Sequence, residues 1–555
     1  MFTTETDVNR RTFLASTTGL LSGTFAGVAA GADETVVSLD GAHHDALNRE
    51  RRIVVQYDAW SQLGHDFEQW LDYRFDYIDE PGSQIDSVWW DVTALGYATY
   101  PSKVLRQMPQ TGLDKWREQG IDWVERLVTE TKRRKLECFW SHRISEVELN
   151  ETGTGAGWQG EPHLIKQAHP DWVINGIWWK QGLWNLAVAE VRELKVLILR
   201  ELAENYDLDG IQLDFARHVP CLPPGRQWEL RGHVTELVRM VRLMLQEVAS
   251  ERGRPLLLAA RVPCNIEGCR RDGFDIAEWA RQQLVDILTL GSRSIVCDIE
   301  GFRRATHGRN IKLQPCHDDH HASDAYQYPP IEFFRGVAAS WWQQGADSIM
   351  TFNWKNARPK LSRRVGEIPG PESQRRAYHE IGSPVTLRGK DKMFVVQRRG
   401  GYPWAEGYFN RNDDAPLPLK LNGDDDAKLV QIPVGDHTIA NARRIRQVLL
   451  RLIVFGADTS DEVAARLNGV PLTLVTRDDR LKDRQIFSPG AQPSSGGADN
   501  WKIDPKQELL RLEYEVDPRL CKLGDNQVSL QLGPHEPARS VKIEKVELHV
   551  RYKAE

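Results

Sequence analysis

Residues 206–220 read YDLDGIQLDFARHVP, and no other part of the chain says as much about its fold class. Ile211 and Leu213 alternate with Gln212, which predicts a short β-strand ending on Asp214. Segments with apolar residues at helical spacing stand before and after this strand. A strand between two helices is typical of a parallel βαβ unit. In a closed (β/α)₈ barrel the carboxyl ends of the strands carry the chemistry, so Asp214 is a candidate functional residue.

Eight segments have the composition of buried strands, and helical patterns lie between several of them. The strand segments are 52–60, 85–92, 136–141, 210–215, 255–262, 285–290, 310–315 and 347–353. The helical patterns are 113–134, 187–205, 228–252, 276–283 and 331–344. We expect an α/β fold, a (β/α)₈ TIM barrel over residues 50–360, with an enlarged loop at 149–184. An open doubly wound sheet would need a glycine-rich phosphate turn after an early strand, and the sequence has none.

Beyond residue 384 the pattern changes to short alternating runs separated by turn residues. These runs are 392–397, 447–455, 509–516 and 541–552. They predict a C-terminal all-β sandwich domain over 385–555. Residues 361–384, rich in Arg, Pro and Gly, are the expected linker between the two domains.

The charge balance and hydropathy of the sequence argue against nucleic acid and membranes as partners. The chain is 41% hydrophobic and 27% charged, with a net charge of −6. This balance offers no electrostatic reason for binding nucleic acid or an anionic membrane. No segment approaches the roughly 20 apolar residues of a membrane span. We therefore expect no nucleic-acid partner and no membrane insertion, and the sequence leaves the oligomeric state open.

The amino-terminal segment has the features of an export signal. Residues 9–14, NRRTFL, resemble the twin-arginine motif, and a weakly apolar stretch over 14–30 ends in the small residues AGA at 30–32. We expect residues 1–32 to be a twin-arginine signal peptide. The expected location of the mature protein is periplasmic or secreted.

Neither cysteines nor histidines indicate a metal site. Seven cysteines form no disulfide framework; Cys264 and Cys269 either pair across a loop or remain buried thiols. The run HDDHH at 317–321 offers metal-binding side chains, but adjacent side chains point apart and rarely converge on one ion. We expect no metal and no cofactor.

Four segments carry a family resemblance. They are YDLDGIQLDFARH at 206–218, GFDIAEWARQQLVDIL at 273–288, FRGVAASWWQQGADSIMTFNW at 334–354 and YHEIGSPVTLRGKDK at 378–392. They resemble the glycosyl hydrolase-like 10 proteins, exported bacterial (β/α)₈ proteins regarded as active on carbohydrate. The resemblance spans residues 50–395 and implies a glycoside hydrolase with a carbohydrate substrate, leaving the sugar open.

Glycosidic cleavage usually needs two carboxyl groups on opposite sides of the bond. Asp214 is the candidate nucleophile or base, with Arg217 and His218 as cationic neighbours that favour its anion. The alternatives for Asp214 are a helix N-cap or a structural ion pair with Arg217.

A second pattern resembles the alpha-amylase family. Gly210, Asp214 and His218 are similar to that family's fourth strand, His317-Asp318 to its seventh-strand pair, and His142 to its third-strand histidine. The chain departs from the pattern twice: Gln212 stands where that family has an Arg, and the fifth strand ends in 261–263, RVP, without a Glu. These departures put the family's acid in doubt.

The second carboxylate is therefore open. The candidates at strand ends are Asp58, Asp91, Glu146, Glu148, Glu267, Asp318 and Asp319. We favour Asp318, then Glu146, as the general acid. The expected substrate-binding residues are Asp58, Trp90, Asp91, His142, Arg143, Arg217, His218, Arg261, His317, Asn353 and Trp354. Arg143 and Arg261 either bind an anionic sugar substituent or pair with a barrel carboxylate.

Tryptophan is heavily used, with 19 residues. Those near the predicted strand ends and the enlarged loop are Trp89, Trp90, Trp140, Trp178, Trp179, Trp184 and Trp354. They suit either a saccharide cleft or core packing. Two other functions remain open: a non-catalytic carbohydrate-binding protein, which needs no paired carboxylates, and a polysaccharide lyase, which needs a base beside cationic groups.

Overall fold

The computed structural model describes most of the chain. The described residues are 36–59, 66–91, 97–108, 111–145, 164–177, 181–291, 294–318, 326, 329–354, 370–398, 415–423, 426–483, 507–534 and 540–554. Residues 38–555 form one compact unit, separate from residues 1–37. The expected signal peptide lies outside the described residues.

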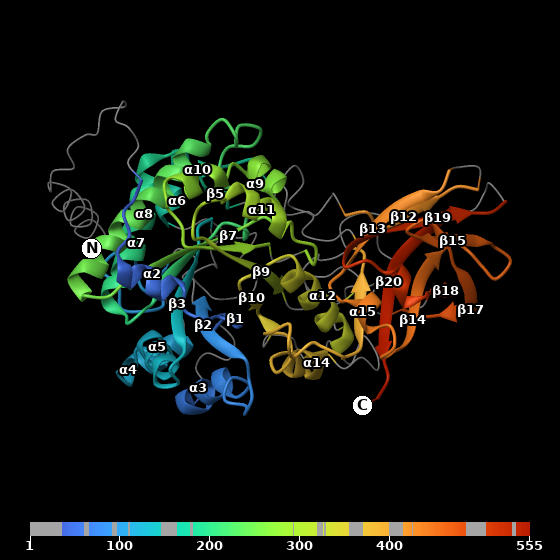
Figure 1. Ribbon diagram of the computed structural model, residues 1–555. Helices are drawn as coiled ribbons and strands as arrows, with labels where there is room; N and C mark the ends of the chain where they lie inside the picture. Colours follow the sequence, from blue (N-terminus) through green and yellow to red (C-terminus); the bar gives the residue numbers. More distant parts are fainter. Residues whose placement is uncertain are drawn as a thin grey trace. The chain divides into compact units, whose positions relative to one another are not determined.

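Eight parallel strands close into a barrel, which confirms the predicted fold class (Figure 1). The strands are β1 (Ile53–Asp58), β2 (Ile85–Asp91), β3 (Glu137–Arg143), β6 (Gly210–Asp214), β7 (Leu257–Val262), β8 (Ile287–Leu290), β9 (Lys312–Asp318) and β10 (Ile349–Phe352). Their order around the barrel is β1-β10-β9-β8-β7-β6-β3-β2. Each predicted strand segment overlaps one of these strands.

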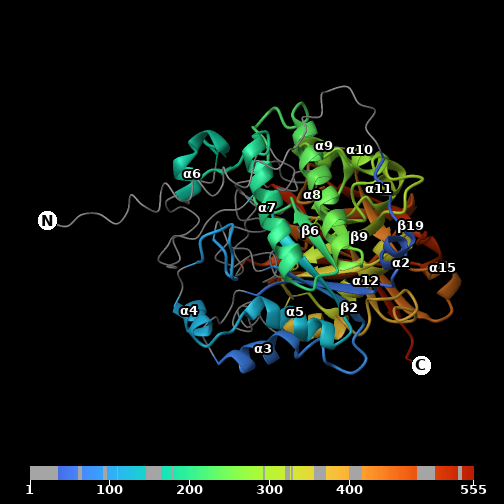
Figure 2. The same ribbon diagram turned by 90° about the vertical axis from the view of Figure 1, so that its left-hand side faces the viewer.

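Helices cover the outside of the barrel, and Figure 2 shows α7 and α8 side by side on this outer layer. The helices of this part are α2 (Gly41–Leu47), α3 (Phe67–Phe75), α4 (Thr111–Glu118), α5 (Trp123–Arg133), α7 (Ala189–Asn205), α8 (Arg231–Arg252), α9 (Ile266–Asp272), α10 (Ile276–Arg281), α11 (Ile299–Ala305) and α12 (Ile331–Gln343).

The helix expected over 113–134 is two helices, α4 and α5. Gly120 adopts a φ of 71° between them, a left-handed conformation that ends a helix. Asp122 then caps α5, because its side chain accepts hydrogen bonds from the backbone N–H groups of Val124 and Glu125. The apolar pattern alone runs across this break, which is why the prediction joined the two helices.

The enlarged loop after β3 carries small elements of its own. Its described part contains α6 (Leu164–Ala168), a 3₁₀ turn at Pro170–Trp172, and a two-stranded sheet of β4 (Val173–Ile174) and β5 (Leu183–Trp184). Trp184 is buried there, and the ammonium groups of Lys166 and Lys195 lie 4.9 and 5.7 Å from its ring centroid. Core packing with cation–π contacts therefore describes Trp184.

The barrel interior contains an apolar cluster, whose members come from seven strands and from α2. They are Leu47, Val54, Trp89, Phe139, Leu257, Ala259, Ile287, Cys316, Met350 and Phe352. Asp286 lies just before β8 and accepts hydrogen bonds from Arg242 at 2.7 Å and from the Leu258 N–H at 2.7 Å. It also pairs with the His43 ring of α2 at 2.8 Å. Helix α2 is thereby fixed to the amino-terminal end of the strands.

Antiparallel sheets follow the barrel in sequence, as predicted. One sheet has the order β11 (Lys392–Val395), β20 (Val541–Tyr552), β14 (Ile445–Phe455), β18 (Leu509–Glu515) and β17 (Thr473–Leu481), with β12 (Leu419–Leu421) also paired to β20. The other has the order β13 (Lys428–Val434), β19 (Gly524–Leu532), β15 (Val463–Leu467) and β16 (Val470–Pro471). The described helical elements beyond residue 400 are α15 (Thr438–Asn441) and a 3₁₀ turn at Pro518–Leu520.

Helix α12 packs against both the barrel and the first strand of the antiparallel sheets. A Cβ at Gly336 would lie 2.0 Å from the Met393 carbonyl oxygen, and one at Gly435 would lie 2.2 Å from the Ala339 carbonyl carbon. The backbones approach this closely only because both positions are glycine. In the described part of the expected linker, α14 (Gly370–Ala377) leads into Tyr378, whose hydroxyl lies 3.2 Å from Thr351 Oγ1 of β10.

All seven cysteines are buried free thiols, which settles the alternative left open for Cys264 and Cys269. No helix in the described part of the chain is long and apolar enough to cross a membrane. Trp341 and Trp342 lie in α12 and donate hydrogen bonds to the carbonyl oxygens of Ile295 and Ile381.

Candidate active site

Strand register brings charged residues from different strands to the same level of the barrel. Asp58 at the end of β1 pairs in register with Asp91 of β2. Asp214 of β6 stands between Arg143 of β3 and Arg261 of β7. Side chains alternate along a strand between its two faces. Gln56 and Gln212, two positions before Asp58 and Asp214, point into the barrel. The charged side chains at these positions therefore meet inside its carboxyl end.

The Asp214 carboxylate is held by Arg261, and both side chains are completely buried. Arg261 Nε donates to Asp214 Oδ1 at 2.8 Å, and Arg261 Nη2 donates to Oδ2. The N–H of Ala216 also donates to Oδ1, at 3.1 Å. A structural ion pair was one alternative for Asp214, and the structure shows such a pair with Arg261 of the neighbouring strand.

A second cluster joins β1, β2 and β3 through Arg143. Its Nη2 lies 2.5 Å from Asp58 Oδ2, and its Nε lies 2.9 Å from Asp91 Oδ2. Arg143 therefore pairs with barrel carboxylates, the second of the two roles considered for it. Burial acts to raise the pKa of Asp58, but Arg143 and Asn353 outweigh it and hold that pKa below the usual carboxyl range.

Asn353 follows β10 and binds Asp58 twice. Its Oδ1 accepts from the Asp58 backbone N–H at 2.8 Å, and its Nδ2 donates to Asp58 Oδ2 at 2.8 Å. Asn353 has a φ of 58°, a left-handed conformation that asparagine tolerates better than most residues. The strand end is thus shaped so that the carboxamide meets Asp58.

Arg217 and His218 follow β6 and are both buried, but they differ in charge state. Burial lowers the pKa of Arg217 to about 10, Arg143 adds to this effect, and Asp58 and Asp318 oppose it. Burial and the nearby Arg217 and Arg143 guanidinium groups hold the pKa of His218 well below its usual value. His218 is therefore neutral at pH 7, and the expectation of a cationic histidine beside Asp214 was wrong.

Asp318 ends β9 and is completely buried. Burial acts to lower the pKa of Arg261, but Asp214 and, less strongly, Asp318 raise it. Asp318 thus acts electrostatically on both Arg217 and Arg261. The sequence-predicted residues that gather inside the barrel end are Asp58, Asp91, Arg143, Asp214, Arg217, Arg261, Asp318 and Asn353.

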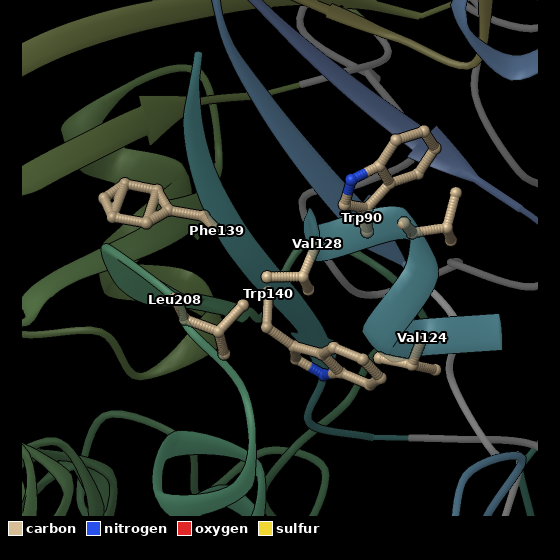
Figure 3. Close-up of a pocket in the computed structure, with 7 residues that line it drawn as sticks. Trp90, Val124, Val128, Phe139, Trp140 and Leu208 are labelled. Carbon is tan, nitrogen blue, oxygen red and sulfur yellow. The ribbon is translucent and has the colours of Figure 1, made fainter. Parts of the chain in front are cut away.

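Trp90 is not part of this group. In Figure 3 the Trp90 and Trp140 indoles lie with Val124 and Val128 of α5, on the other side of β3 from Phe139. Trp90 Nε1 donates to Thr131 Oγ1 of the same helix at 2.9 Å. Its expected role in sugar binding was wrong, because alternation along β2 turns it toward the helices while Asp91 points inward.

Three other predicted binding residues also lie away from the barrel axis. His142 stands between the inward-facing Ser141 and Arg143, so its side chain leaves β3 on the opposite face. His317 packs edge-on against Phe334 of α12, with ring centroids 5.4 Å apart. Trp354 donates to His317 Nδ1 at 3.2 Å and is 3% exposed. His317 and Trp354 belong to the packing between the barrel and α12.

Several candidates fall outside the group or outside the described residues. Glu267 is exposed on α9. Glu146, Glu148, Asp319 and the remaining His320 and His321, together with Trp178 and Trp179, lie outside the described residues. Among the side chains that the structure describes, no group of three or more His, Cys, Asp or Glu residues is arranged to hold a metal ion.

Polar residues below the charged group were missed by the sequence analysis. Gln56, Ser141, Thr289 and Gln314 face the barrel interior and hydrogen-bond to one another or to Gln212. Gln212 stands where the alpha-amylase pattern has an Arg; here Arg261 of the next strand supplies the guanidinium to Asp214. The available signal was a polar residue at the inward position of five predicted strands, 52–60, 136–141, 210–215, 285–290 and 310–315.

Residues 74–222 match the family model described as glycosyl hydrolase-like 10, which confirms the resemblance over that range. The matched segment contains Asp91, Arg143, Asp214, Arg217 and His218. No curated protein matches the chain.

Solved structures with partial likeness include carbohydrate enzymes. Alpha-L-fucosidase isoenzyme 2 from Paenibacillus thiaminolyticus is 15% identical, over 60% of this chain and 48% of that one, with a TM-score of 0.38. Chitinase ChiW from Paenibacillus sp. str. FPU-7 is 10% identical, over 88% and 56%, with a TM-score of 0.38. The PgaB (BpsB) glycoside hydrolase domain from Bordetella bronchiseptica is 11% identical, over 60% and 99%, with a TM-score of 0.39. The chain spans about half the length of the first two.

Proposed function

We propose that the chain is a glycoside hydrolase that acts on a poly- or oligosaccharide. The observation that carries the proposal is the group of four aspartates and three arginines inside the carboxyl end of a closed parallel barrel, the end at which such barrels carry their catalytic residues. Part of this group lies in the segment that matches a glycosyl hydrolase-like family. Two carboxyl groups are the usual requirement for the reaction.

Asp214 is the proposed nucleophile, or the base that activates water. The two hydrogen bonds from Arg261 favour the anion and fix the orientation of the carboxylate. Each carboxylate oxygen has two lone-pair sites, and Oδ1 already accepts from both Arg261 and the Ala216 N–H, so the site that remains for a substrate or a water molecule is on Oδ2. Arg261 then positions the reacting oxygen.

Asp318 is the proposed general acid. A general acid must hold a proton at the working pH. Asp58 is less suited, because Arg143 and Asn353 hold its pKa below the usual carboxyl range despite its burial. Asp58 instead suits hydrogen bonding to sugar hydroxyls, together with Asn353. Glu146 remains the second candidate for the acid.

A panel of polysaccharides and oligosaccharides tests the proposal. The mature protein is incubated with each sugar, and new reducing ends and products are measured by mass spectrometry. Cleavage of at least one sugar by the wild type, and its loss in Asp214→Asn, supports the hydrolase. Products that carry a new double bond, detected by their ultraviolet absorbance, would show a lyase instead.

A non-catalytic carbohydrate-binding protein is the second candidate. The observation in its favour is that Arg261 engages both oxygens of Asp214, and Arg143 lies against both Asp58 and Asp91. Such pairing also serves to hold charges in a barrel that binds sugar without cleaving it. Calorimetric binding of a panel sugar with no product after long incubation would favour this candidate.

A further inference from the structure

A continuous line of hydrogen bonds crosses the barrel interior below the charged group. It runs Arg261–Gln56–Ser141–Gln212–Thr289–Gln314–Ser348, with donor–acceptor distances of 3.0, 2.7, 2.7, 2.9, 3.0 and 2.9 Å. Carboxamides and hydroxyls alternate along it, and we call it the amide–hydroxyl chain. Its members after Arg261 come from β1, β3, β6, β8, β9 and the residue before β10.

All the hydrogen bonds of the amide–hydroxyl chain point in one direction, away from Arg261. A guanidinium can only donate, so Gln56 must turn its Oε1 toward Arg261 and its Nε2 toward Ser141. Ser141 Oγ, which accepts from Gln56, donates in turn to Gln212 Oε1. The same logic carries through Thr289 to the end of the chain. The arginine therefore sets the orientation of every group.

Burial makes the amide–hydroxyl chain sensitive to the loss of any one of its hydrogen bonds. Gln56, Ser141, Gln212, Thr289 and Gln314 are all 0% exposed. Bulk water therefore has no access to replace a lost partner, and a buried donor without one is costly. Hydrogen bonds in line also polarise one another in a low-dielectric interior.

We propose that the amide–hydroxyl chain is a positioning network that holds the Arg261 guanidinium, and through it the Asp214 carboxylate, in the geometry needed for catalysis. The carbonyl of Gln56 supports one edge of the guanidinium, and the Phe352 ring lies 4.3 Å from the guanidinium carbon. Asp214 accepts from Nε and Nη2 of the same guanidinium. This role rests on the proposed function only in its catalytic part; the restraint on Arg261 stands independently.

Thr289→Val is the test variant, because it removes one hydroxyl from the chain with almost no change in volume. Thr289→Ser keeps the hydroxyl and serves as the conservative rescue. Thr351→Val is the matched control: Thr351 is also 0% exposed and also on a barrel strand, but its hydroxyl bonds to Tyr378 outside the amide–hydroxyl chain. Ser141→Ala, two bonds from Arg261, is a second test variant in case Thr289→Val does not fold.

The first measurement does not depend on activity. Arginine side chains are labelled with ¹⁵N, the Arg261 Nε–H signal is identified by its absence in Arg261→Lys, and its exchange with solvent is timed by NMR. Losing the two buried hydrogen bonds of the Thr289 hydroxyl, to Gln212 and Gln314, should speed this exchange by about fivefold to tenfold in Thr289→Val. Thr289→Ser and Thr351→Val should exchange as the wild type does.

The second measurement is kinetic, with the sugar identified by the panel. Thr289→Val should lower kcat by about tenfold with little change in KM, because the network affects the reacting carboxylate rather than sugar binding. Equal exchange rates in Thr289→Val and Thr351→Val would overturn the positioning role. If Arg261 Nε–H exchange is faster in Thr289→Val than in Thr351→Val but the wild type cleaves no sugar, the proposed function fails while the restraint on Arg261 by the network is supported.

Discussion

Arg261 donates from two nitrogens to the two oxygens of Asp214, across the register of β6 and β7, in the completely buried interior of the barrel. The pair combines a structural and a chemical role. Removing one partner of a buried pair leaves the other charge without compensation, which is more damaging than losing a surface pair. The consequences for stability and for turnover are separable with suitable variants.

Asp214→Asn should lower both the turnover and the stability of the protein. We expect kcat to fall at least about a thousandfold, because an amide serves neither as nucleophile nor as base. We also expect the free energy of unfolding to fall by about 3 kcal/mol, since Arg261 keeps its charge beside a neutral partner. Initial rates and urea unfolding measure the two effects.

The matched control is Asp286→Asn. Asp286 is a buried carboxylate that pairs with the buried Arg242, but it lies at the amino-terminal end of β8, remote from the proposed chemistry. The Asp286→Asn variant should lose about as much stability as Asp214→Asn and keep most of its kcat. If Asp286→Asn and Asp214→Asn lower kcat equally, Asp214 has no role beyond the ion pair.

The fold could be predicted because every barrel strand has the same kind of pattern in the sequence. Each is a short apolar run, and helical patterns lie between several of these runs, as on both sides of 210–215; the closed parallel arrangement follows from that order. The one error in the predicted helices, between α4 and α5, came from an apolar pattern that continues across Gly120.

The site could be predicted only to the level of the strand ends. Trp90, His142 and His317 each stand next to an inward-facing residue, so strand position alone does not separate them from Asp91, Arg143 and Asp318. Trp90 and His317 face helices instead, and His142 leaves β3 on the face opposite Arg143. The pairing of Arg261 with Asp214 depends on the register between β6 and β7, which no local pattern expresses.

Export offers an independent prediction, since we propose that the chain leaves the cytoplasm by the twin-arginine route. Replacing Arg10 and Arg11 with lysine should retain the precursor in the cell, because this route reads the arginine pair as an address. Fractionation and immunoblotting measure the distribution. Secretion that persists in the variant, but stops when the general secretion machinery is blocked, would show that the motif is accidental.

Glu380 predicts a defined acid sensitivity. Burial acts to raise its pKa, but Arg335, Arg376 and Lys390 lower it to about 2. A carboxyl group whose pKa falls on folding stabilises the native state above its unfolded pKa, about 4.3, and loses this contribution as the pH falls toward 2. Glu380→Gln should therefore lower the free energy of unfolding at pH 7 by about 2 kcal/mol.

The difference between Glu380→Gln and the wild type should shrink between about pH 4.3 and pH 2 and vanish below it. Glu372→Gln, on the exposed face of α14, is the control and should leave the free energy of unfolding unchanged over this range. A difference between Glu380→Gln and the wild type that stays constant down to pH 2 would mean that the side chain acts through packing rather than charge.

Leaving-group chemistry tests the proposed acid. Asp318→Asn should lower kcat/KM on a natural glycoside by about a hundredfold or more, but much less on an aryl glycoside of the same sugar whose leaving group needs no proton. Asp58→Asn should lower kcat/KM equally on both substrates, because Asp58 is proposed to bind hydroxyls that the two substrates share. Ratios of kcat/KM between the two substrates measure this. An equal loss on both substrates for Asp318→Asn would transfer the acid role to Glu146, for which the same pair of substrates is then decisive.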